Sequence, residues 1–410
     1  MNININIPKK VETALNILNK NGYEAYIVGG CVRDSLLGSA PNDWDITTSA
    51  KPEEICNCFK GYRTINTGLK HGTVTVIING MQLEITTYRI DGKYTDNRRP
   101  DSVLFTNDVS DDLRRRDFTI NALAYNKEGI VDLFDGISDI ENKIIKCVGE
   151  PDERFNEDGL RILRALRFAS VLDFNIDEKT SWSIHKNKEL LNNISKERIS
   201  SEFSKLVTGS NFCNIMSEYK DVIEIIISEV KSFNEKTWEN ILASMDNTNE
   251  LVLKLSLLLY KTKNAENILK NLKYEGKTVK DVKAIVSNKD EELIPDKISI
   301  KKQLNKIGYD NYINLVNFKT AIYKVNEDKN NQELNNIKNV EMKLNDIVVN
   351  KECYNLKQLK VNGENLIEEG FAKGIFLGSI LNEILCLVIE EQLENKKEVL
   401  IEYVKKYKNI

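Results

Sequence analysis

The most informative part of the chain is Tyr26-Ile-Val-Gly-Gly-Cys-Val-Arg33-Asp34-Ser-Leu-Leu-Gly38, which is followed by Asp43-Trp44-Asp45-Ile46. An apolar, β-type run ends here in Gly29-Gly30, and residues 32–37 predict a helix. Small residues at such a turn let backbone N–H groups and the beginning of a helix approach phosphate oxygens. Because Arg33 adds a charged donor, the stretch predicts a phosphate-binding turn.

The two carboxylates that follow this turn are separated by one residue. In a β-strand, residues i and i+2 point to the same face, so Asp43 and Asp45 are predicted to project side by side. Adjacent carboxylates repel one another unless a cation lies between them, and hard divalent cations such as Mg²⁺ prefer oxygen ligands. The pair is therefore a candidate magnesium site, although an Asp-x-Asp taken alone is more often a solvated strand end.

The combined pattern is more specific than its parts. Gly-Gly-x-Val-Arg-Asp, then Leu-Leu-Gly, then Asp-x-Asp resembles the nucleotidyltransferase class that contains bacterial tRNA CCA-adding enzymes, including those of Bacillus type, and bacterial poly(A) polymerases. The resemblance implies that an RNA 3′-hydroxyl attacks the α-phosphate of a nucleoside triphosphate and releases pyrophosphate. Two Mg²⁺ ions would carry this reaction, with Asp43 and Asp45 as metal ligands and catalytic residues.

A second motif, Arg114-Arg115-Arg116-Asp117-Phe118-Thr119-Ile120-Asn121, matches the same class without a gap. From the residues alone, three arginines before an amphipathic stretch could equally form a solvated, basic start of a helix. The resemblance implies that Arg116 contacts the triphosphate, while Asp117 and Asn121 help to hold the ribose and the geometry of the site.

A third motif spans residues 157–168, which we interpret as part of one helix. At about 100° per residue, its charged members share one face and its apolar members the opposite face. The charged members are Glu157, Asp158, Arg161 and Arg164. Ion pairs on a wet helix surface would explain this pattern without any further role. The resemblance instead implies a nucleotide-binding face, to which the motif adds Arg167.

The chemistry of the bases suits this implied role. Cytosine and adenine both present an exocyclic amine beside an unprotonated ring nitrogen, whereas uracil and guanine present a carbonyl beside a ring N–H. The carboxylate of Asp158 can accept from the amine, and the guanidinium of Arg161 can donate to the ring nitrogen. Since an unpaired polar group in a dry pocket costs about 1–3 kcal/mol, this pair would select CTP and ATP.

Two β-branched runs, residues 66–78 and 81–89, flank Asn79-Gly80 and predict a hairpin with a tight turn. Glu84 lies in the second run. The resemblance makes it the third carboxylate of the metal site, although an exposed strand glutamate would fit the sequence equally well. The polar segment 91–111 resembles the flexible loop of the class, and its full length favours addition of the terminal A as well as C.

Beyond residue 146 the strand signals fade and helical periodicity continues. The predicted fold class is α+β, with a small mixed or antiparallel sheet and flanking helices in the head, followed by an all-helical neck, body and tail. We expect a catalytic head at 1–145, a neck with base recognition at 146–210, a body at 211–325 and a tRNA-binding tail at 326–410. The Asn/Lys-rich stretch 326–345 is interpreted as a surface excursion or linker.

Composition fits a multi-domain cytoplasmic enzyme. The 410 residues are 41% hydrophobic and 29% charged, enough for several domains with cores of their own. We expect no signal sequence and no membrane span, since the longest apolar segment, 375–389, is too short to cross a bilayer. Seven scattered cysteines favour free thiols in a reducing compartment. The net charge of −4 argues against a uniformly basic RNA-binding surface but not against a local basic groove.

Four hypotheses follow. The leading one is a tRNA nucleotidyltransferase that adds CCA, with the tRNA acceptor end, CTP and ATP as partners, acting as a monomer or homodimer. A poly(A) polymerase would use ATP alone, and an A-adding enzyme would depend on a separate CC-adding partner. A catalytically silent RNA-binding protein of the same fold is the fourth. A silenced site would have no reason to keep all of the following residues together, which argues against it: Asp43, Asp45, Arg116, Asp158 and Arg161.

Overall fold

The computed structural model describes residues 5–66, 68–92, 102–371 and 374–407. The chain divides into two compact units, Met1–Ser232 and Phe233–Ile410. Each unit has its own core, and we describe them separately.

A seven-stranded mixed sheet forms the centre of the first part of unit 1, in the order β3-β4-β5-β2-β1-β8-β9. All its neighbouring strands are antiparallel except β2 and β5, which run parallel. All four residues of β1 are buried, so protein covers both faces of the sheet at this strand. The strands are β1 (Ala25–Val28), β2 (Asp45–Thr48), β3 (Arg63–Ile65), β4 (Thr73–Ile78), β5 (Met81–Thr87), β8 (Leu123–Asn126) and β9 (Gly129–Asp132).

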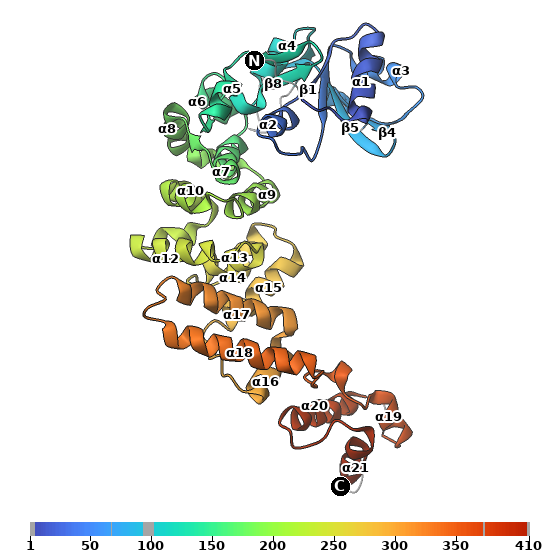
Figure 1. Ribbon diagram of the computed structural model, residues 1–410, viewed down its shortest axis with the longest axis vertical. Coiled ribbons are helices and arrows are strands. Elements are labelled where there is room, and N and C mark those ends of the chain that lie inside the picture. The colour runs from blue at the N-terminus through green and yellow to red at the C-terminus, as the bar shows by residue number, and fades with distance from the viewer. Residues whose placement is uncertain (1–4, 67, 93–101, 372–373, 408–410) are drawn as a thin grey trace. The chain divides into compact units, whose positions relative to one another are not determined.

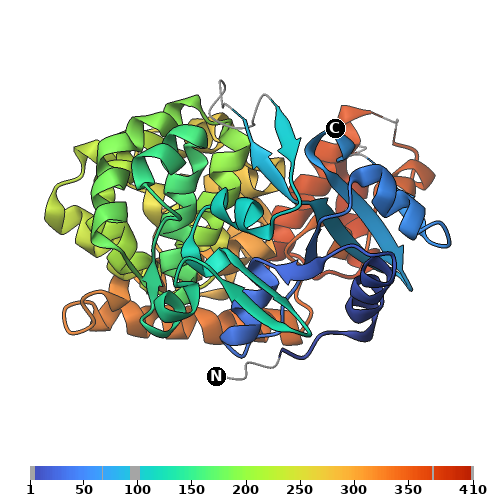
Figure 2. The same cartoon turned by 90° about the horizontal axis from the view of Figure 1, so that it is seen from above.

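Helices pack around this sheet. Helices α1 and α3 lie next to each other, with α3 against β4 and β5, whereas α2 packs on β1 and β8 (Figure 1). Figure 2 shows the same strands from a second direction. Helix α2 follows the glycine pair as expected, although it begins at Gly30 rather than at residue 32. The helices are α1 (Lys9–Lys20), α2 (Gly30–Leu36), α3 (Pro52–Cys58), α4 (Val109–Arg114), α5 (Gly136–Glu141) and the 3-10 turns η1 (Leu69–His71) and η2 (Thr119–Asn121).

The predicted hairpin is confirmed as β4 and β5. Asn79 and Gly80 both have positive φ, 48° and 82°, which is the backbone of a two-residue type I′ turn. Within the predicted loop 91–111, a short antiparallel pair joins β6 (Arg89–Asp91) to β7 (Val103–Phe105), and α4 occupies its end. Residues 93–101 of that loop lie outside the described residues.

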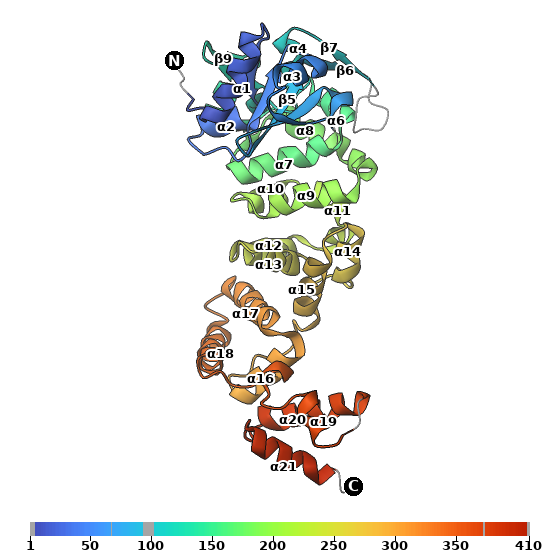
Figure 3. The ribbon, with the colours of Figure 1, turned by 90° about the vertical axis from the view of Figure 1, so that its right-hand side faces the viewer.

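The rest of unit 1 is mainly helical. The apolar face expected for the third motif is buried in α7, where Ile162, Leu163, Leu166 and Ala169 are fully enclosed. Helix α7 packs on α9 and α10, as Figure 3 shows. A two-residue parallel pair of β10 (Ile144–Ile145) and β11 (Asn175–Ile176) corrects the expectation of an all-helical remainder. The elements are α6 (Pro151–Glu157), α7 (Leu160–Leu172), α8 (Glu178–Asn187), η3 (Lys188–Asn193), α9 (Lys196–Val207), α10 (Phe212–Glu218), α11 (Lys220–Ile226) and η4 (Ser228–Ser232).

Unit 2 is helical throughout its described part apart from connecting turns. Its last three helices enclose a core of their own that includes Leu366, Ile384, Leu385, Leu400 and Val404. The elements are α12 (Glu235–Asp246), α13 (Leu251–Leu259), α14 (Ala265–Asn271), α15 (Gly276–Ser287), α16 (Lys297–Ile307), α17 (Tyr309–Lys324), α18 (Asn331–Val349), η5 (Leu356–Gln358), α19 (Gly363–Glu368), α20 (Ile375–Ile389) and α21 (Lys397–Tyr407).

The interpretation of residues 326–345 as a linker is wrong. Most of this stretch belongs to α18, which runs beside α17 and α16. Four apolar residues at helical spacing, Ile337, Val340, Leu344 and Ile347, bury one stripe of α18, and the asparagines and lysines occupy its outer surface. The α+β fold class is confirmed by the mixed sheet and the helices that follow it. Across the described residues, no helix combines the length and apolarity that crossing a membrane requires.

Candidate active site

A cavity of about 840 Å³ in unit 1 gathers residues from all three sequence motifs. The predicted site residues that line it are Gly29, Gly30, Arg33, Asp43, Asp45, Arg116, Asp117, Asn121, Arg164 and Arg167. Four other predicted residues, Glu84, Glu157, Asp158 and Arg161, are not among its lining residues. The fold thus brings the phosphate turn, the Asp-x-Asp pair and the second motif to one place.

The glycine turn depends on a backbone that only glycine adopts readily. Gly29 has φ 80° and ψ −129°, and it immediately precedes α2. A methyl group at Gly29 would lie 2.9 Å from Nη1 of Arg116. Gly29 is therefore required both for the bend of the chain and for the close approach of the Arg116 guanidinium.

The two aspartates lie at the beginning of β2. Asp45 is its first residue and Asp43 precedes the strand, so only part of the predicted Asp-x-Asp segment is a β-strand. The predicted alternation still holds, because Trp44 and Ile46 are buried while both aspartates are open to the cavity. The chain enters the sheet at this point with its two carboxylates on one side.

Glu84 is the cross-strand neighbour of Asp45 in the parallel pairing of β2 and β5. Burial raises the pKa of Asp45, Glu84 and Asp43 raise it further, and Arg116 opposes them. Within the described ranges, no three His, Cys, Asp or Glu side chains converge as a metal-ligand cluster. Glu84 therefore lies beside Asp45, but among the described residues it does not form one metal-ligand cluster with Asp43 and Asp45. The mutual repulsion of these acids is of the kind that a divalent cation relieves, so Asp43 and Asp45 fit a metal site with oxygen ligands.

Asp117 and Asn121 link the phosphate turn to α7. Arg33 donates from Nη1 to Oδ1 of Asn121 at 2.6 Å, and Asn121 donates from Nδ2 to Oδ1 of Asp117 at 3.1 Å. Arg164 completes the chain with an ion pair to Oδ2 of Asp117 at 2.5 Å. Although burial opposes its ionisation, Arg164 and Asn121 hold the pKa of Asp117 well below its usual range. We call this series the Arg33–Arg164 chain.

The third motif is not one helix, which corrects the sequence prediction. Glu157 is the last residue of α6, Asp158 has an extended backbone with φ −140°, and α7 begins at Leu160. A side chain at Gly159 would meet Leu190 at 3.0 Å, so contact with a distant segment accompanies the bend. The carboxylate of Asp158 accepts from the N–H of Leu160 at 3.1 Å and so caps α7.

Asp158 and Arg161 are engaged with other residues rather than with each other. Arg198 from α9 contacts Asp158 at 2.7 Å, and Glu157 contacts Arg161 at 2.6 Å. Arg161 also donates to the backbone carbonyls of Arg115 and Arg154. The i,i+4 ion pair between Glu157 and Arg161 is the contact expected of a structural role, although it bridges two helices.

Several lining residues were missed by sequence reasoning. Phe168 packs beneath three guanidinium groups, with Arg167 at 3.8 Å, Arg33 at 5.0 Å and Arg164 at 5.4 Å from the ring centroid. Burial lowers the pKa of Arg167 to about 10, against the influence of Glu202, its partner at 3.1 Å. The third motif contains Phe168, so its spacing from the arginines was a usable signal. The last turn of α9 adds Lys205, and the segment after it adds Thr208 and Ser210. These residues reach the cavity because α7 packs on α9.

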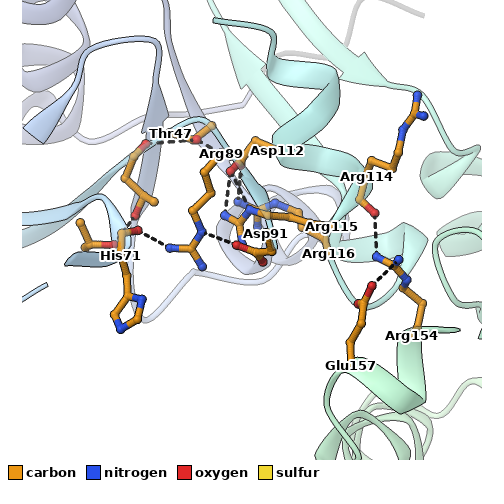
Figure 4. Close-up of polar contacts among 12 residues, drawn as sticks. Thr47, His71, Arg89, Asp91, Asp112, Arg114, Arg115, Arg116, Arg154 and Glu157 are labelled. Atoms are coloured by element: carbon orange, nitrogen blue, oxygen red, sulfur yellow. Dashed lines mark hydrogen bonds and ion pairs between the residues drawn. The ribbon is translucent and has the colours of Figure 1, made fainter. Parts of the chain in front are cut away.

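A second polar network lies behind the cavity and is drawn in Figure 4. Asp112 in α4 accepts from Arg115, Arg116 and Thr47. Arg115 also approaches Asp91 at 3.7 Å, and Asp91 pairs with Arg89 at 2.9 Å. The arginine triplet is therefore not a solvated helix start, because α4 ends at Arg114 and the next two arginines contact a buried carboxylate.

Comparison with known families identifies the class. Residues 25–146 match the family described as Poly A polymerase head domain, and residues 173–218 match the probable RNA and SrmB-binding site of polymerase A. Residues 244–404 match the family described as tRNA nucleotidyltransferase domain 2, putative. The fold, the cavity and these matches define a nucleotidyltransferase. Enzymes of this kind generally use a divalent metal ion.

Full-length relatives define the family within that class. The chain is 38% identical to the CCA-adding enzyme of Ligilactobacillus salivarius, over 98% of each chain, and 36% identical to that of Lactobacillus helveticus, over 96% of each. The crystal structure of the Bacillus stearothermophilus CCA-adding enzyme in complex with CTP has a TM-score of 0.80 at 29% identity, covering 98% of both chains. The chain belongs to the CCA-adding enzyme family of tRNA nucleotidyltransferases, which confirms the resemblance found in its sequence.

Proposed function

We propose that this protein adds C, C and A in turn to the 3′ end of tRNA, using CTP and ATP and releasing pyrophosphate. The observation that carries the proposal is the single cavity that joins Asp43 and Asp45 to the glycine turn and to Arg33 and Arg116. A nucleotidyl transfer needs acidic metal ligands within reach of groups that hold a triphosphate, and this cavity provides both. The full-length relatives support the same activity.

Asp43 and Asp45 are the proposed metal ligands, and Mg²⁺ is the proposed ion. When bound, Mg²⁺ lowers the pKa of the attacking 3′-hydroxyl and neutralises charge on the triphosphate. Glu84 acts on this pair from the neighbouring strand, because its charge raises the pKa of Asp45, an effect that a bound cation would offset.

Arg33 and Arg116 are the proposed triphosphate ligands, together with the backbone of Gly29 and Gly30. Nε of Arg116 is buried and makes no hydrogen bond to any described residue, which leaves one donor of this side chain unused. Asp117 and Asn121 are proposed to position Arg33 and the ribose through the Arg33–Arg164 chain. Arg164 and Arg167 extend the basic wall of the cavity.

Asp158 and Arg161 remain the proposed base-reading pair. For this role each must exchange a present partner for the base, Arg198 in the case of Asp158 and Glu157 in the case of Arg161. An exchange of ion-pair partners for hydrogen bonds to a base is a small change in free energy when both sets are well formed. The proposal therefore requires that bound CTP or ATP displaces these two ion pairs.

The division into head (1–145), neck (146–210), body (211–325) and tRNA-binding tail (326–410) accompanies this proposal. We also propose a cytoplasmic location, and a monomer or homodimer as the active form.

The decisive assay supplies the protein with tRNA lacking its last three nucleotides, Mg²⁺, and CTP and ATP separately and together. Three additions that require both nucleotides are expected. An open ladder with ATP alone would indicate poly(A) synthesis, and a single A added only to tRNA that already ends in CC would indicate an A-adding enzyme. Asp43→Ala and Asp45→Ala should each lower incorporation by roughly a thousandfold while leaving the fold intact. Binding of tRNA without any incorporation by the parent protein would indicate a silent RNA-binding protein.

A further inference from the structure

Asp112 is a buried carboxylate that none of the sequence motifs assigned to the reaction. It lies in α4 and is completely inaccessible to solvent. Its Oδ1 accepts from Nε and Nη2 of Arg115 at 3.0 and 2.7 Å. Its Oδ2 accepts from Nη2 of Arg116 at 3.3 Å and from the hydroxyl of Thr47 at 3.2 Å. Both oxygens are thus fully used, as a buried charge requires.

The partners of Asp112 come from two functionally different places, the segment that follows α4 and strand β2. Thr47 lies in β2, two residues after Asp45, and its side chain is completely buried. Arg116 lines the cavity and reaches the glycine turn, where its Nη1 would lie 2.9 Å from a methyl group at Gly29. One carboxylate therefore connects the strand of the acidic pair to the arginine beside the phosphate turn, as Figure 4 shows.

Among the described residues, Asp112 is the carboxylate within ion-pair distance of the Arg116 side chain, although the charge of Asp45 also attracts it. Its Nη2 contacts Asp112, and its buried Nε has no hydrogen-bond partner among the described residues. An arginine side chain has several rotatable bonds, so a single charged contact decides which of its rotamers is populated. Without the carboxylate, the guanidinium would be free to leave the position between Gly29 and the cavity.

We propose that Asp112 is a positioning residue for nucleotide binding, which holds the guanidinium of Arg116 in place against the glycine turn and aligns it with β2. It does not itself line the cavity, so it acts only through Arg116. The inference rests on the proposed function, because it assigns Asp112 to the triphosphate contact made by Arg116. It extends that function to a residue which touches no substrate.

A purely structural role for Asp112 makes a different prediction. Substitution of Arg115 distinguishes that role from the proposed positioning of Arg116. Arg115 forms the shorter ion pair with the same carboxylate, yet it is not a lining residue of the cavity. If Asp112 only anchors α4, loss of Arg115 and loss of Arg116 should affect folding alike. If Asp112 positions Arg116, the nucleotide KM should respond to Asp112 and Arg116 and not to Arg115.

The test measures KM and kcat for CTP and ATP, KM for tRNA, and the binding of CTP by calorimetry without RNA. Asp112→Asn keeps the shape and one acceptor of the side chain but removes the charge. It should raise KM for both nucleotides about tenfold, the loss expected for a charge-assisted hydrogen bond, and leave KM for tRNA unchanged. The matched variant Arg115→Gln should keep the nucleotide KM within about twofold of the parent value, because Arg115 does not line the cavity, although it should lower stability.

A double-mutant cycle tests whether the effect passes through Arg116. In an Arg116→Gln background, Asp112→Asn should add less than about twofold to the nucleotide KM, because the group it positions is already lost. If Asp112→Asn does not fold, Thr47→Val removes the neutral hydrogen bond to the same oxygen and should raise the nucleotide KM roughly threefold.

Two results would overturn the inference. One is a folded Asp112→Asn protein with the parent KM for CTP and ATP, and the other is a penalty that persists in full when Arg116 is already replaced. A parent protein that adds nothing to tRNA would refute the proposed function instead. Calorimetry with CTP alone would then still show whether Asp112→Asn weakens nucleotide binding.

Discussion

Asp45 and Glu84 occupy directly opposed positions in the parallel pairing of β2 with β5. The first residue of the strand that carries the acidic pair therefore has a second carboxylate as its nearest neighbour across the sheet. This arrangement raises the pKa of Asp45 in addition to the effect of burial, while Arg116 acts in the opposite direction. After burial, the sheet register makes the largest contribution to the raised pKa of the proposed metal ligand, because it places Glu84 opposite Asp45.

Glu84→Gln tests this coupling through the pH dependence of the reaction. Nucleotide incorporation needs ionised Asp45, so a raised pKa makes the rate fall at a higher pH than for an ordinary aspartate. Removal of the Glu84 charge should lower that pKa and shift the acid limb of the kcat/KM profile to lower pH. Glu53→Gln, on α3, serves as a control that should leave the limb in place. An unchanged profile for Glu84→Gln would mean that the two carboxylates are not coupled.

Gly29→Ala tests the space and the backbone of the phosphate turn. The added methyl group would have to accept a φ of 80° and would lie 2.9 Å from Nη1 of Arg116. The substitution should therefore lower the free energy of unfolding by about 2 kcal/mol and raise the KM for CTP. Gly38→Ala is the matched control, because Gly38 has φ 72° but nothing within 4 Å of the added methyl group. The control should lose some stability and keep its KM. Equal effects of both variants on KM would argue against a close contact at Gly29.

Asp117→Asn tests the central link of the Arg33–Arg164 chain. Loss of one partner of this buried ion pair should cost about 3 kcal/mol at neutral pH, measured by urea unfolding. The pKa of Asp117 is lowered in the folded state, so its contribution is present above the ordinary value of 3.8 and is lost as the pH falls below it. The stability difference between parent and variant should therefore shrink in acid. The matched control Asp173→Asn, which removes an exposed pair with Lys143, should change stability little.

Asp158→Ala tests base selection. If Asp158 reads the base, discrimination against UTP and GTP should fall roughly ten- to hundredfold while metal-dependent transfer of CTP persists in part. Misincorporation assays with each triphosphate measure this ratio. Because Asp158 also caps α7 and pairs with Arg198, Arg198→Met controls for the loss of that ion pair. Unchanged rejection of UTP and GTP by Asp158→Ala would exclude the role.

Features set by short-range patterns could be predicted from the sequence. The hairpin at Asn79-Gly80 follows from a turn that requires positive φ at two successive residues, and the alternation around Trp44 follows from strand geometry. The glycine pair Gly29-Gly30 correctly predicted the turn before α2. The family followed from three motifs in fixed order, each of which the structure brings to unit 1.

Features set by distant contacts could not be predicted in this way. Helical periodicity continued through Asp158, yet the chain bends there, where Gly159 packs against Leu190. Composition suggested a linker at 326–345, whereas the spacing of Ile337, Val340, Leu344 and Ile347 determined a helix. The contacts of Asp112 with Arg115 and Arg116 are local, but the hydrogen bond from Thr47 comes from 65 residues away along the chain, so no local pattern indicated it.

The Arg33–Arg164 chain has a consequence for sequence variation among relatives. Its four members come from three motifs that are far apart along the polypeptide, yet each donates to or accepts from the next. Replacement of any one member leaves its neighbour with an unmatched buried group, so a change is tolerated only when a second change compensates for it. Substitutions at these four positions should therefore co-vary among relatives. An enzyme in which one member is replaced should also carry a substitution at the member that is hydrogen-bonded to it.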